Sequence, residues 1–217
     1  MNLERARFNM VEQQIRTWEV LDKDVLDLLF VVKREEFVPP AYRQLAFADL
    51  EIPLGRGATM LAPKVEAKIL QALALRKSDK VLEIGAGSGY MAALLAARTD
   101  HVYTVEIDLD LATMARENLK RNAVDNATVE LGDGARGWSM HAPYDVIVIS
   151  GSTPVLPQEF LQQLKPGGRL AAIVGEPPVM EAQLVTCVGD NSFRTANLFE
   201  TCVAPLKNAQ QRERFVF

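Results

Sequence analysis

Short apolar runs alternate with segments of helical character from residue 80 onward, and this alternation narrows the possible folds more than any other feature of the chain. The runs occupy residues 81–84, 102–105, 128–131, 146–149 and 169–174. A further helix at 157–164 and a turn at 165–168 are expected before the last run. Strands spaced by helices are joined by right-handed crossovers, which place them parallel in one sheet. The sequence therefore predicts an α/β fold with a doubly wound, Rossmann-like, mostly parallel sheet.

The N-terminal part of the chain has a different pattern. Apolar residues recur three or four positions apart over residues 5–15 and 22–32, which predicts a helical section within residues 1–45. Between residues 47 and 63, Gly and Pro residues interrupt this spacing, so we expect a long, shaped loop there. Helical spacing resumes over residues 65–75.

The C-terminal part predicts an antiparallel pair at the sheet edge. Two β-like runs, at residues 182–188 and 193–204, flank the sequence Gly-Asp-Asn-Ser, which is typical of a hairpin. The two cysteines, Cys187 and Cys202, fall on these runs and are expected to be thiols rather than a disulfide. The polar end of the chain, residues 207–217, closes with an apolar tripeptide. It either docks on the body of the domain, which we expect, or covers the acceptor cleft.

Composition and charge argue against several classes of protein. The formal net charge is -4 and no block of Lys and Arg occurs, so binding to nucleic acid is not expected. No apolar run is long enough to span a bilayer, and the polar N-terminus lacks the apolar stretch of a secretory signal, so we expect a cytoplasmic location. Because His101 and His141 are the only histidines and form no cluster with cysteines, no metal site is expected.

The strongest local motif is Glu83-Ile84-Gly85-Ala86-Gly87-Ser88-Gly89, which follows the first apolar run and opens a helical segment. Glycines in such a turn let the backbone bend sharply and let a ligand approach without meeting a Cβ atom. One residue separates the last two glycines, whereas a dinucleotide-binding motif has two there. This spacing favours S-adenosylmethionine over NAD, and we predict that Glu83, Gly85, Gly87 and Gly89 belong to its binding site.

Acidic residues follow the next two apolar runs. Glu106 ends the second run, where such folds place an acid that accepts both ribose hydroxyls. Asp133 follows the third run and is placed to accept the adenine amino group, with its carboxylate or through a neighbouring backbone group such as that of Gly134. The strand ends would then converge on one crevice. Taken singly, each feature is also typical of a tight turn or a helix cap, and Asp108 and Asp110 are predicted to be caps.

Segments outside this motif carry a family signature. They read Met-Val-Glu-Gln-Gln-Ile at residues 10–15, Arg-Glu-Glu-Phe-Val-Pro at 34–39 and Ala-Asp-Leu-Glu-Ile-Pro-Leu-Gly at 48–55, and the stretch 161–170 is similar as well. With these segments the chain resembles the protein-L-isoaspartate O-methyltransferases over roughly residues 8–176. The resemblance implies a class I methyltransferase that uses S-adenosylmethionine to methylate isoaspartyl carboxylates of damaged proteins, and hence a protein or peptide substrate.

The resemblance also implies an active-site loop, which reads Gly-Gln-Thr-Ile-Ser-x-Pro in that family. Here residues 57–63 read Gly-Ala-Thr-Met-Leu-Ala-Pro, so Thr59 is the implied catalytic residue. Leu61 stands at the position of the serine most closely tied to activity, and Ala58 replaces the glutamine. After the fourth run, Ser152 or Thr153 would supply the missing polar contact, unless both are turn and cap residues.

Two functions remain open on this basis. The chain is either an active carboxyl methyltransferase, for isoaspartyl residues or a related carboxylate, or a catalytically impaired homologue that binds S-adenosylmethionine as a regulatory module. On both views a length of 217 residues fits a single domain. Residues 1–63 would form its helical N-terminal section and active-site loop, and residues 64–217 its cofactor-binding α/β core.

Overall fold

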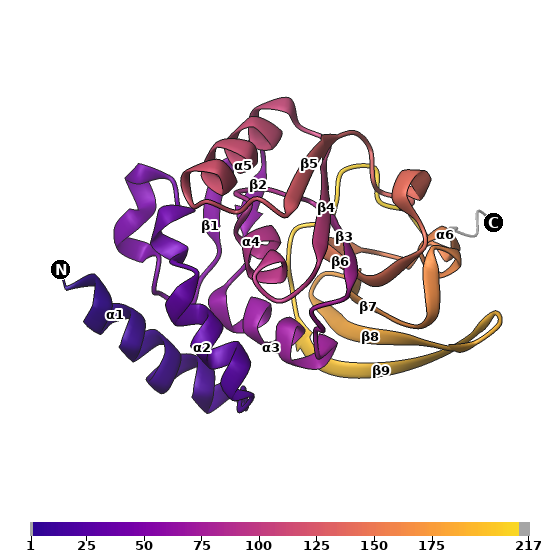
Figure 1. Ribbon diagram of the computed structural model, residues 1–217, viewed down its shortest axis with the longest axis horizontal. Coiled ribbons are helices and arrows are strands. Elements are labelled where there is room, and N and C mark those ends of the chain that lie inside the picture. The colour runs from indigo at the N-terminus through magenta and orange to yellow at the C-terminus, as the bar shows by residue number, and fades with distance from the viewer. Residues whose placement is uncertain (1, 213–217) are drawn as a thin grey trace.

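A computed structural model of the chain describes residues 2–212 (Figure 1). Its main sheet has seven strands in the order β5-β4-β3-β6-β7-β8-β9. These are β3 (Lys80–Ile84), β4 (His101–Glu106), β5 (Ala127–Leu131), β6 (Tyr144–Thr153), β7 (Leu164–Glu176), β8 (Val179–Gly189) and β9 (Ser192–Thr201). The first five strands run parallel, whereas β8 is antiparallel to both β7 and β9. The predicted sheet and its C-terminal antiparallel hairpin are confirmed.

The central strands are stable because they bury apolar side chains on both faces. Val81 and Leu82 of β3 point to opposite faces and are both fully buried. Leu82 pairs in register with Ile147 of β6, which is also fully buried. Branched apolar residues suit a strand that is covered on both sides. A hydrophobic cluster therefore lies on each face of the sheet, with Val81 in one and Leu82 in the other.

Helices cover the two faces of the sheet unequally (Figure 1). They are α1 (Leu3–Asn9), α2 (Lys23–Val31), α3 (Pro63–Leu73), α4 (Tyr90–Ala96), α5 (Leu109–Arg121) and α6 (Gln158–Gln162). Side chains of α2, α3, α4 and α5 belong to the cluster on one face, and Phe160 of α6 belongs to the cluster on the other. Asp108 caps α5 as predicted, because its Oδ1 accepts from the backbone N–H of Asp110 at 3.0 Å. Asp110 is not a cap: its carboxylate pairs with Arg56.

Two segments differ from their predictions. The long loop expected between residues 47 and 63 contains an antiparallel hairpin of β1 (Ile52–Gly55) and β2 (Ala58–Met60). The turn expected at residues 165–168 belongs instead to β7, where the register with β6 is interrupted. In both segments the Gly and Pro residues do mark a bend. The strands nevertheless pair on either side of it, β1 with β2 in the first segment and β7 with β6 in the second.

Other expectations concern the chain ends and the cysteines. The helix predicted over residues 5–15 is formed by the end of α1 and by a π-helix at Met10–Ile15 that follows it directly. Both cysteines are free thiols, with Cys187 buried and Cys202 exposed. The apolar tripeptide at residues 215–217 lies outside the described residues. Within residues 2–212, no helix combines the length and the apolarity needed to cross a membrane.

Candidate functional site

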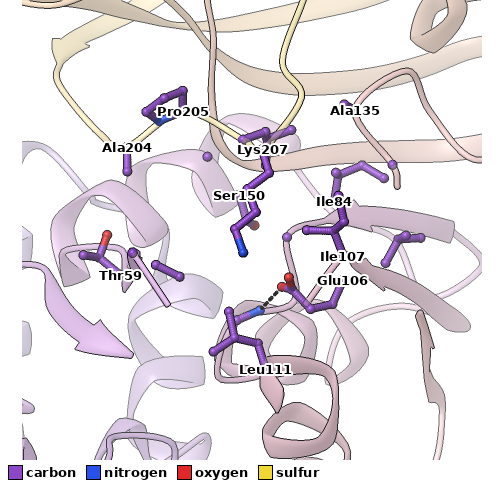
Figure 2. A pocket seen from close by; sticks show the side chains of 18 of the residues that line it. Thr59, Ile84, Glu106, Ile107, Leu111, Ala135, Ser150, Ala204, Pro205 and Lys207 are labelled. Atoms are coloured by element: carbon purple, nitrogen blue, oxygen red, sulfur yellow. Dashed lines mark hydrogen bonds between the residues drawn. The ribbon is translucent and has the colours of Figure 1, made fainter. Parts of the chain in front are cut away.

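A cavity opens at the carboxyl ends of β3, β4 and β6, the edge at which open parallel sheets bind ligands (Figure 2). It holds about 770 Å³ of empty space, its open mouth included. Its walls come from the β1–β2 hairpin, the glycine motif, the turn after β5, the end of β6 and residues 203–207. In Figure 2, Thr59 and Glu106 lie on opposite sides, and Lys207 reaches between them from above.

The predicted glycine motif forms one wall of the cavity. Gly85 and Gly87 line it with φ angles of 93° and 52°, a left-handed backbone conformation that favours glycine. The turn is fixed where the N–H of Gly85 donates to the carbonyl of Val105 at 2.8 Å. Gly89 does not line the cavity, because it begins α4 and packs against Ala115 of α5. The motif therefore presents bare backbone at two of its three glycines.

The carboxylate of Glu106 faces the cavity from the end of β4. Its Oε2 accepts from the N–H of Gly87 at 2.9 Å, and its Oε1 accepts from the N–H of Asp108 at 3.0 Å. Each carboxylate oxygen has two lone pairs, so Glu106 can accept further hydrogen bonds from a ligand. The same contacts hold the carboxylate in place against the glycine motif.

Asp133 and Gly134 line the cavity beside β5. Asp133 Oδ1 accepts from the N–H of Ala135 at 3.0 Å, and Oδ2 accepts from the side-chain amide of Asn208 at 2.8 Å. A Cβ atom on Gly134 would lie 2.7 Å from Cδ1 of Ile84, so this wall needs a glycine. One cavity is thus lined by the glycine motif, Glu106, Asp133 and Gly134.

A smaller inner recess continues the cavity beneath the β1–β2 hairpin. The two spaces share Thr59, Leu61, Gly85, Gly87 and Ser150 as lining residues. The inner recess is further lined by four buried residues with polar side chains, Glu66, Glu83, Ser88 and Tyr90. A ligand in the cavity can therefore extend into the inner recess past the glycine motif.

Glu83 faces the inner recess rather than the main cavity. Its Oε2 accepts from Thr104 Oγ1 at 2.7 Å, and its Oε1 accepts from Ser150 Oγ at 2.8 Å. Burial raises the pKa of Glu83 to about 8, because an ionised carboxylate loses its hydration there, although both hydroxyl bonds act in the opposite direction. Burial at this position therefore favours the protonated form of Glu83.

A buried ion pair next to the loop at residues 57–63 was not predicted. Glu66 of α3 pairs with Arg34, and Arg34 also donates to the backbone carbonyl of Leu61 at 2.6 Å. Burial raises the pKa of Glu66 to about 7, against the lowering effect of the Arg34 charge. The ring of Tyr90 lies 5.1 Å from the Arg34 guanidinium. A signal was present in the sequence, since Glu66 shares the apolar face of α3 with Leu73.

The implied catalytic residue lies where the cavity and the inner recess meet. Thr59 lines both, and its Oγ1 donates to Glu51 Oε2 at 2.7 Å. Leu61 also lines both and is 5% exposed. The position of the family serine is therefore an apolar wall.

Residues 203–207, which we call the covering segment, lie across the mouth of the cavity. The N–H of Ser152 donates to the carbonyl of Ala204 at 3.0 Å, and the N–H of Leu206 donates to the carbonyl of Ser152 at 2.9 Å. The Ser152 hydroxyl donates to the carbonyl of Val203 at 3.0 Å. The position of residues 203–207 was not predicted, because it depends on contacts such as that of Ser152 with Val203, 51 positions away.

The expectation that Ser152 or Thr153 supplies a polar contact to the site is wrong. Both hydroxyls donate to backbone carbonyls, that of Ser152 to Val203 and that of Thr153 to Val155 at 2.6 Å. Neither residue lines the cavity or the inner recess. Ser150, two positions earlier, lines both. Residues 2–212 contain no group of three or more His, Cys, Asp or Glu residues that could hold a metal ion.

The sequence matches the family described as protein-L-isoaspartate(D-aspartate) O-methyltransferase over residues 5–211. A curated protein-L-isoaspartate O-methyltransferase of Aeropyrum pernix is 38% identical over 205 residues, which cover 93% of this chain and 79% of that protein. A relative of the same name from Methanoculleus marisnigri is 40% identical over 202 residues, covering 93% of this chain and 91% of that protein.

Solved structures give the same picture of the fold. One described as a protein-L-isoaspartate O-methyltransferase is 25% identical with a TM-score of 0.78, covering 92% of this chain and 65% of that one. The chain thus spans about two thirds of that solved protein. A Plasmodium falciparum structure, described as a β-aspartate methyltransferase in complex with S-adenosyl-L-homocysteine, has a TM-score of 0.80 and 21% identity, covering 95% and 98% of the two chains. At that identity the likeness concerns the fold.

Proposed function

The chain belongs to the protein-L-isoaspartate(D-aspartate) O-methyltransferase family, and from this premise we propose that it uses S-adenosylmethionine to methylate isoaspartyl residues of damaged proteins. The proposal is carried by the cavity in which the glycine motif, Glu106 and Asp133 lie beside the hairpin that bears Thr59. A donor site and an acceptor-side loop are thus parts of one hollow.

The polar groups of the cavity suit S-adenosylmethionine. Glu106 would accept hydrogen bonds from the ribose hydroxyls and Asp133 from the adenine amino group, because ionised carboxylates are strong acceptors. Gly85 and Gly87 line the cavity with backbone alone, which would let the methionyl part approach closely. When bound, the cofactor supplies a methyl group activated by its attachment to a sulfonium cation.

The reaction does not require the protein to transfer a proton. The acceptor carboxylate, with an ordinary pKa of about 4, is already ionised at neutral pH, so no residue has to act as a general base. The residues of the chain have to align the acceptor oxygen and exclude water. Such alignment lowers barriers by up to roughly 7–11 kcal/mol in well-oriented reactions.

The elements around the cavity fit these two tasks. Thr59 presents a hydroxyl and backbone on the acceptor side, at the junction of the cavity and the inner recess. The covering segment shields the donor side, where Leu206 packs close to Gly85 and Gly151. A less hydrated site strengthens the attraction between an acceptor carboxylate and a sulfonium cation.

A specific observation favours a second candidate function. Leu61 places an apolar wall where the family has a serine hydroxyl, and neither Ser152 nor Thr153 replaces that hydroxyl. The second candidate is therefore a homologue that binds S-adenosylmethionine and transfers its methyl group poorly or to another carboxylate.

A labelled-methyl transfer assay separates the two candidates. We expect label on a peptide with one isoaspartyl residue and none on the same peptide with an ordinary aspartyl residue. A cell extract serves as a third pool of acceptors. Label on the extract alone would indicate a different carboxylate. Absence of label from all three pools, together with calorimetric binding of the cofactor, would favour the binding module.

The remaining aspects of function are proposed with it. We also propose a protein substrate in the cytoplasm and no nucleic-acid or membrane partner, because a net charge of -4 gives no general attraction to phosphate groups. One catalytic domain over residues 1–217 is supported by the cavity itself, because the hairpin at its wall belongs to residues 1–63 and the glycine motif to residues 64–217.

A further inference from the structure

The indole ring of Trp138 packs against the turn at residues 132–137, which carries Asp133. A Cβ atom on Gly132 would lie 2.7 Å from Cζ3 of Trp138 and closer still to Cη2, so the ring rests directly on the glycine backbone. Gly132 lines the cavity, whereas Trp138 is half-buried and does not line it. The indole therefore supports this wall of the cavity from the outside.

Hydrogen bonds fix both the backbone and the ring of Trp138. Its N–H donates to Gln163 Oε1 at 2.8 Å, and its carbonyl accepts from the Tyr144 hydroxyl at 2.6 Å. The indole Nε1–H donates to Glu130 Oε2. The other oxygen of Glu130, Oε1, lies 2.7 Å from His141 Nε2. Glu130, on β5, therefore sets the orientation of the ring.

The turn needs such support because its own backbone is rich in glycine. Gly132, Gly134 and Gly137 give it more conformational freedom than residues with a Cβ atom would. One hydrogen bond closes it, from the N–H of Gly137 to the carbonyl of Gly134 at 2.9 Å, and the N–H of Gly132 donates to the carbonyl of Glu106 at 2.9 Å. The Asp133 side chain is exposed, so its place depends on the shape of the turn. Packing of the indole on the turn limits how far this carboxylate can move.

We propose that Trp138 and Glu130 are positioning residues for the adenine of the cofactor. Glu130 orients the indole, and the indole holds the turn so that the Asp133 carboxylate meets the adenine amino group. This inference rests on the proposed function, since it presupposes S-adenosylmethionine or its product in the cavity. Because both residues act through Asp133, their loss should lower selectivity for adenine more than binding in general.

Calorimetry with two ligands measures this selectivity without turnover. S-adenosylhomocysteine carries the amino group, whereas S-inosylhomocysteine has a carbonyl oxygen in its place, which would face the Asp133 carboxylate as a second acceptor. We expect wild type to bind S-adenosylhomocysteine at least tenfold more tightly. In Trp138→Leu this ratio should fall at least threefold. A smaller folded fraction would weaken both ligands alike, so the ratio is independent of stability.

Two substitutions of Glu130 test whether the orientation of the ring matters. Glu130→Gln keeps an oxygen that can accept from the indole N–H, so the ratio should stay close to that of wild type. Glu130→Leu removes the acceptor at similar size, so the ratio should fall at least twofold. Trp18→Leu is the matched control for Trp138→Leu, because Trp18 lies outside the cavity, against Lys64 at 4.3 Å. It should leave the ratio unchanged.

The outcomes separate this inference from the proposed function. A wild-type ratio near one, a ratio that Trp138→Leu leaves unchanged, or an equal fall in Trp18→Leu overturns the role of Trp138 and leaves methyl transfer standing. Equal ratios in Glu130→Gln and Glu130→Leu overturn the role of Glu130. Failure of wild type to bind S-adenosylhomocysteine would instead overturn the proposed function. If Trp138→Leu does not fold, the two Glu130 variants decide.

Discussion

Leu61 is the residue whose chemistry matters most for the acceptor. We expect Leu61→Ser to raise methyl transfer to an isoaspartyl peptide several-fold, because it returns a hydroxyl to the wall shared by the cavity and the inner recess. Losing the buried side chain should cost about 2–4 kcal/mol of stability. Leu61→Ala makes a similar hole without the hydroxyl, so initial rates of the two variants isolate its effect. Equal rates would show that the hydroxyl is dispensable.

Glu106 and Asp133 should govern affinity for the cofactor. We expect Glu106→Ala or Asp133→Ala to weaken binding of S-adenosylmethionine at least several-fold, since a hydrogen bond to a charged group contributes about 1.5–3 kcal/mol. Isothermal titration calorimetry measures the change. Glu117→Ala, an exposed acid on α5, is the control and should bind like wild type. Unchanged affinity in both test variants would contradict the assigned roles.

Glu83 should make stability depend on pH. Its pKa is about 8 when folded and near the ordinary 4.5 when unfolded, so between these values only the folded state holds the proton. The stability that Glu83 gives to the folded state in this way is complete below pH 4.5 and is lost as pH rises through about 8. Between these pH values the free energy of unfolding falls by up to about 1.4 kcal/mol per pH unit. Glu66 acts in the same direction up to about pH 7.

We therefore expect Glu83→Gln to flatten the decline in the free energy of unfolding between pH 5 and 8. Urea denaturation at several pH values measures the slope for wild type and variant. Glu117→Gln changes an exposed acid and should keep the wild-type slope. A variant slope equal to that of wild type would argue against a raised pKa at Glu83.

Single residues were predictable where they belong to a local pattern. Gly85, Gly87, Glu106 and Asp133 follow strand ends at short range, and the carboxyl ends of parallel strands meet at one edge, so their meeting could be expected. Glu66 could be noticed as an acid on an apolar helix face, but its partner Arg34 lies 32 positions away and is set by packing.

At the scale of elements, the cavity depends on the β1–β2 hairpin and the covering segment, neither of which the sequence pattern predicts. The β1–β2 hairpin was expected as a loop, because its strands are short and Pro53, Gly55 and Gly57 lie in β1 and the turn that follows it. Its tip is tied to α5 by the ion pair between Arg56 and Asp110. The covering segment has no periodicity of its own, and its position follows from hydrogen bonds to β6.

The covering segment should control how fast ligand leaves. We expect Ser152→Ala to speed dissociation of S-adenosylhomocysteine several-fold and to cost about 1 kcal/mol, because it removes the bond to the Val203 carbonyl. Stopped-flow competition measures the rate. Ser139→Ala, at an exposed serine outside the cavity, should change neither quantity. Loss of stability with an unchanged dissociation rate would assign Ser152 a structural role only.

At the scale of the whole molecule, the N-terminal section and the α/β core are joined through the floor of the site. The buried pair of Arg34 and Glu66 crosses between them, and Arg34 also donates to the backbone carbonyl of Leu61. Breaking one partner of such a pair leaves an uncompensated buried charge. We therefore expect the two parts to unfold in one transition.

The two tryptophans make this prediction testable. Trp18 lies in the N-terminal section and Trp138 in the core, so Trp138→Phe and Trp18→Phe each leave one reporter. In each variant the urea midpoint from fluorescence should equal that from far-UV circular dichroism. An earlier fluorescence midpoint in the variant that keeps Trp18 would show that the N-terminal section unfolds by itself.

The placement of the hairpin and the covering segment also affects how the protein is made. One wall of the cavity comes from residues 57–61 and its roof from residues 203–207, so early and late parts of the chain close the same hollow. Once residues 1–176 have left the ribosome, every strand of the parallel sheet is available to pair, whereas the roof is still missing. Nascent chains can therefore gain their scaffold during translation, whereas the cavity is closed only after residues 203–207 have emerged.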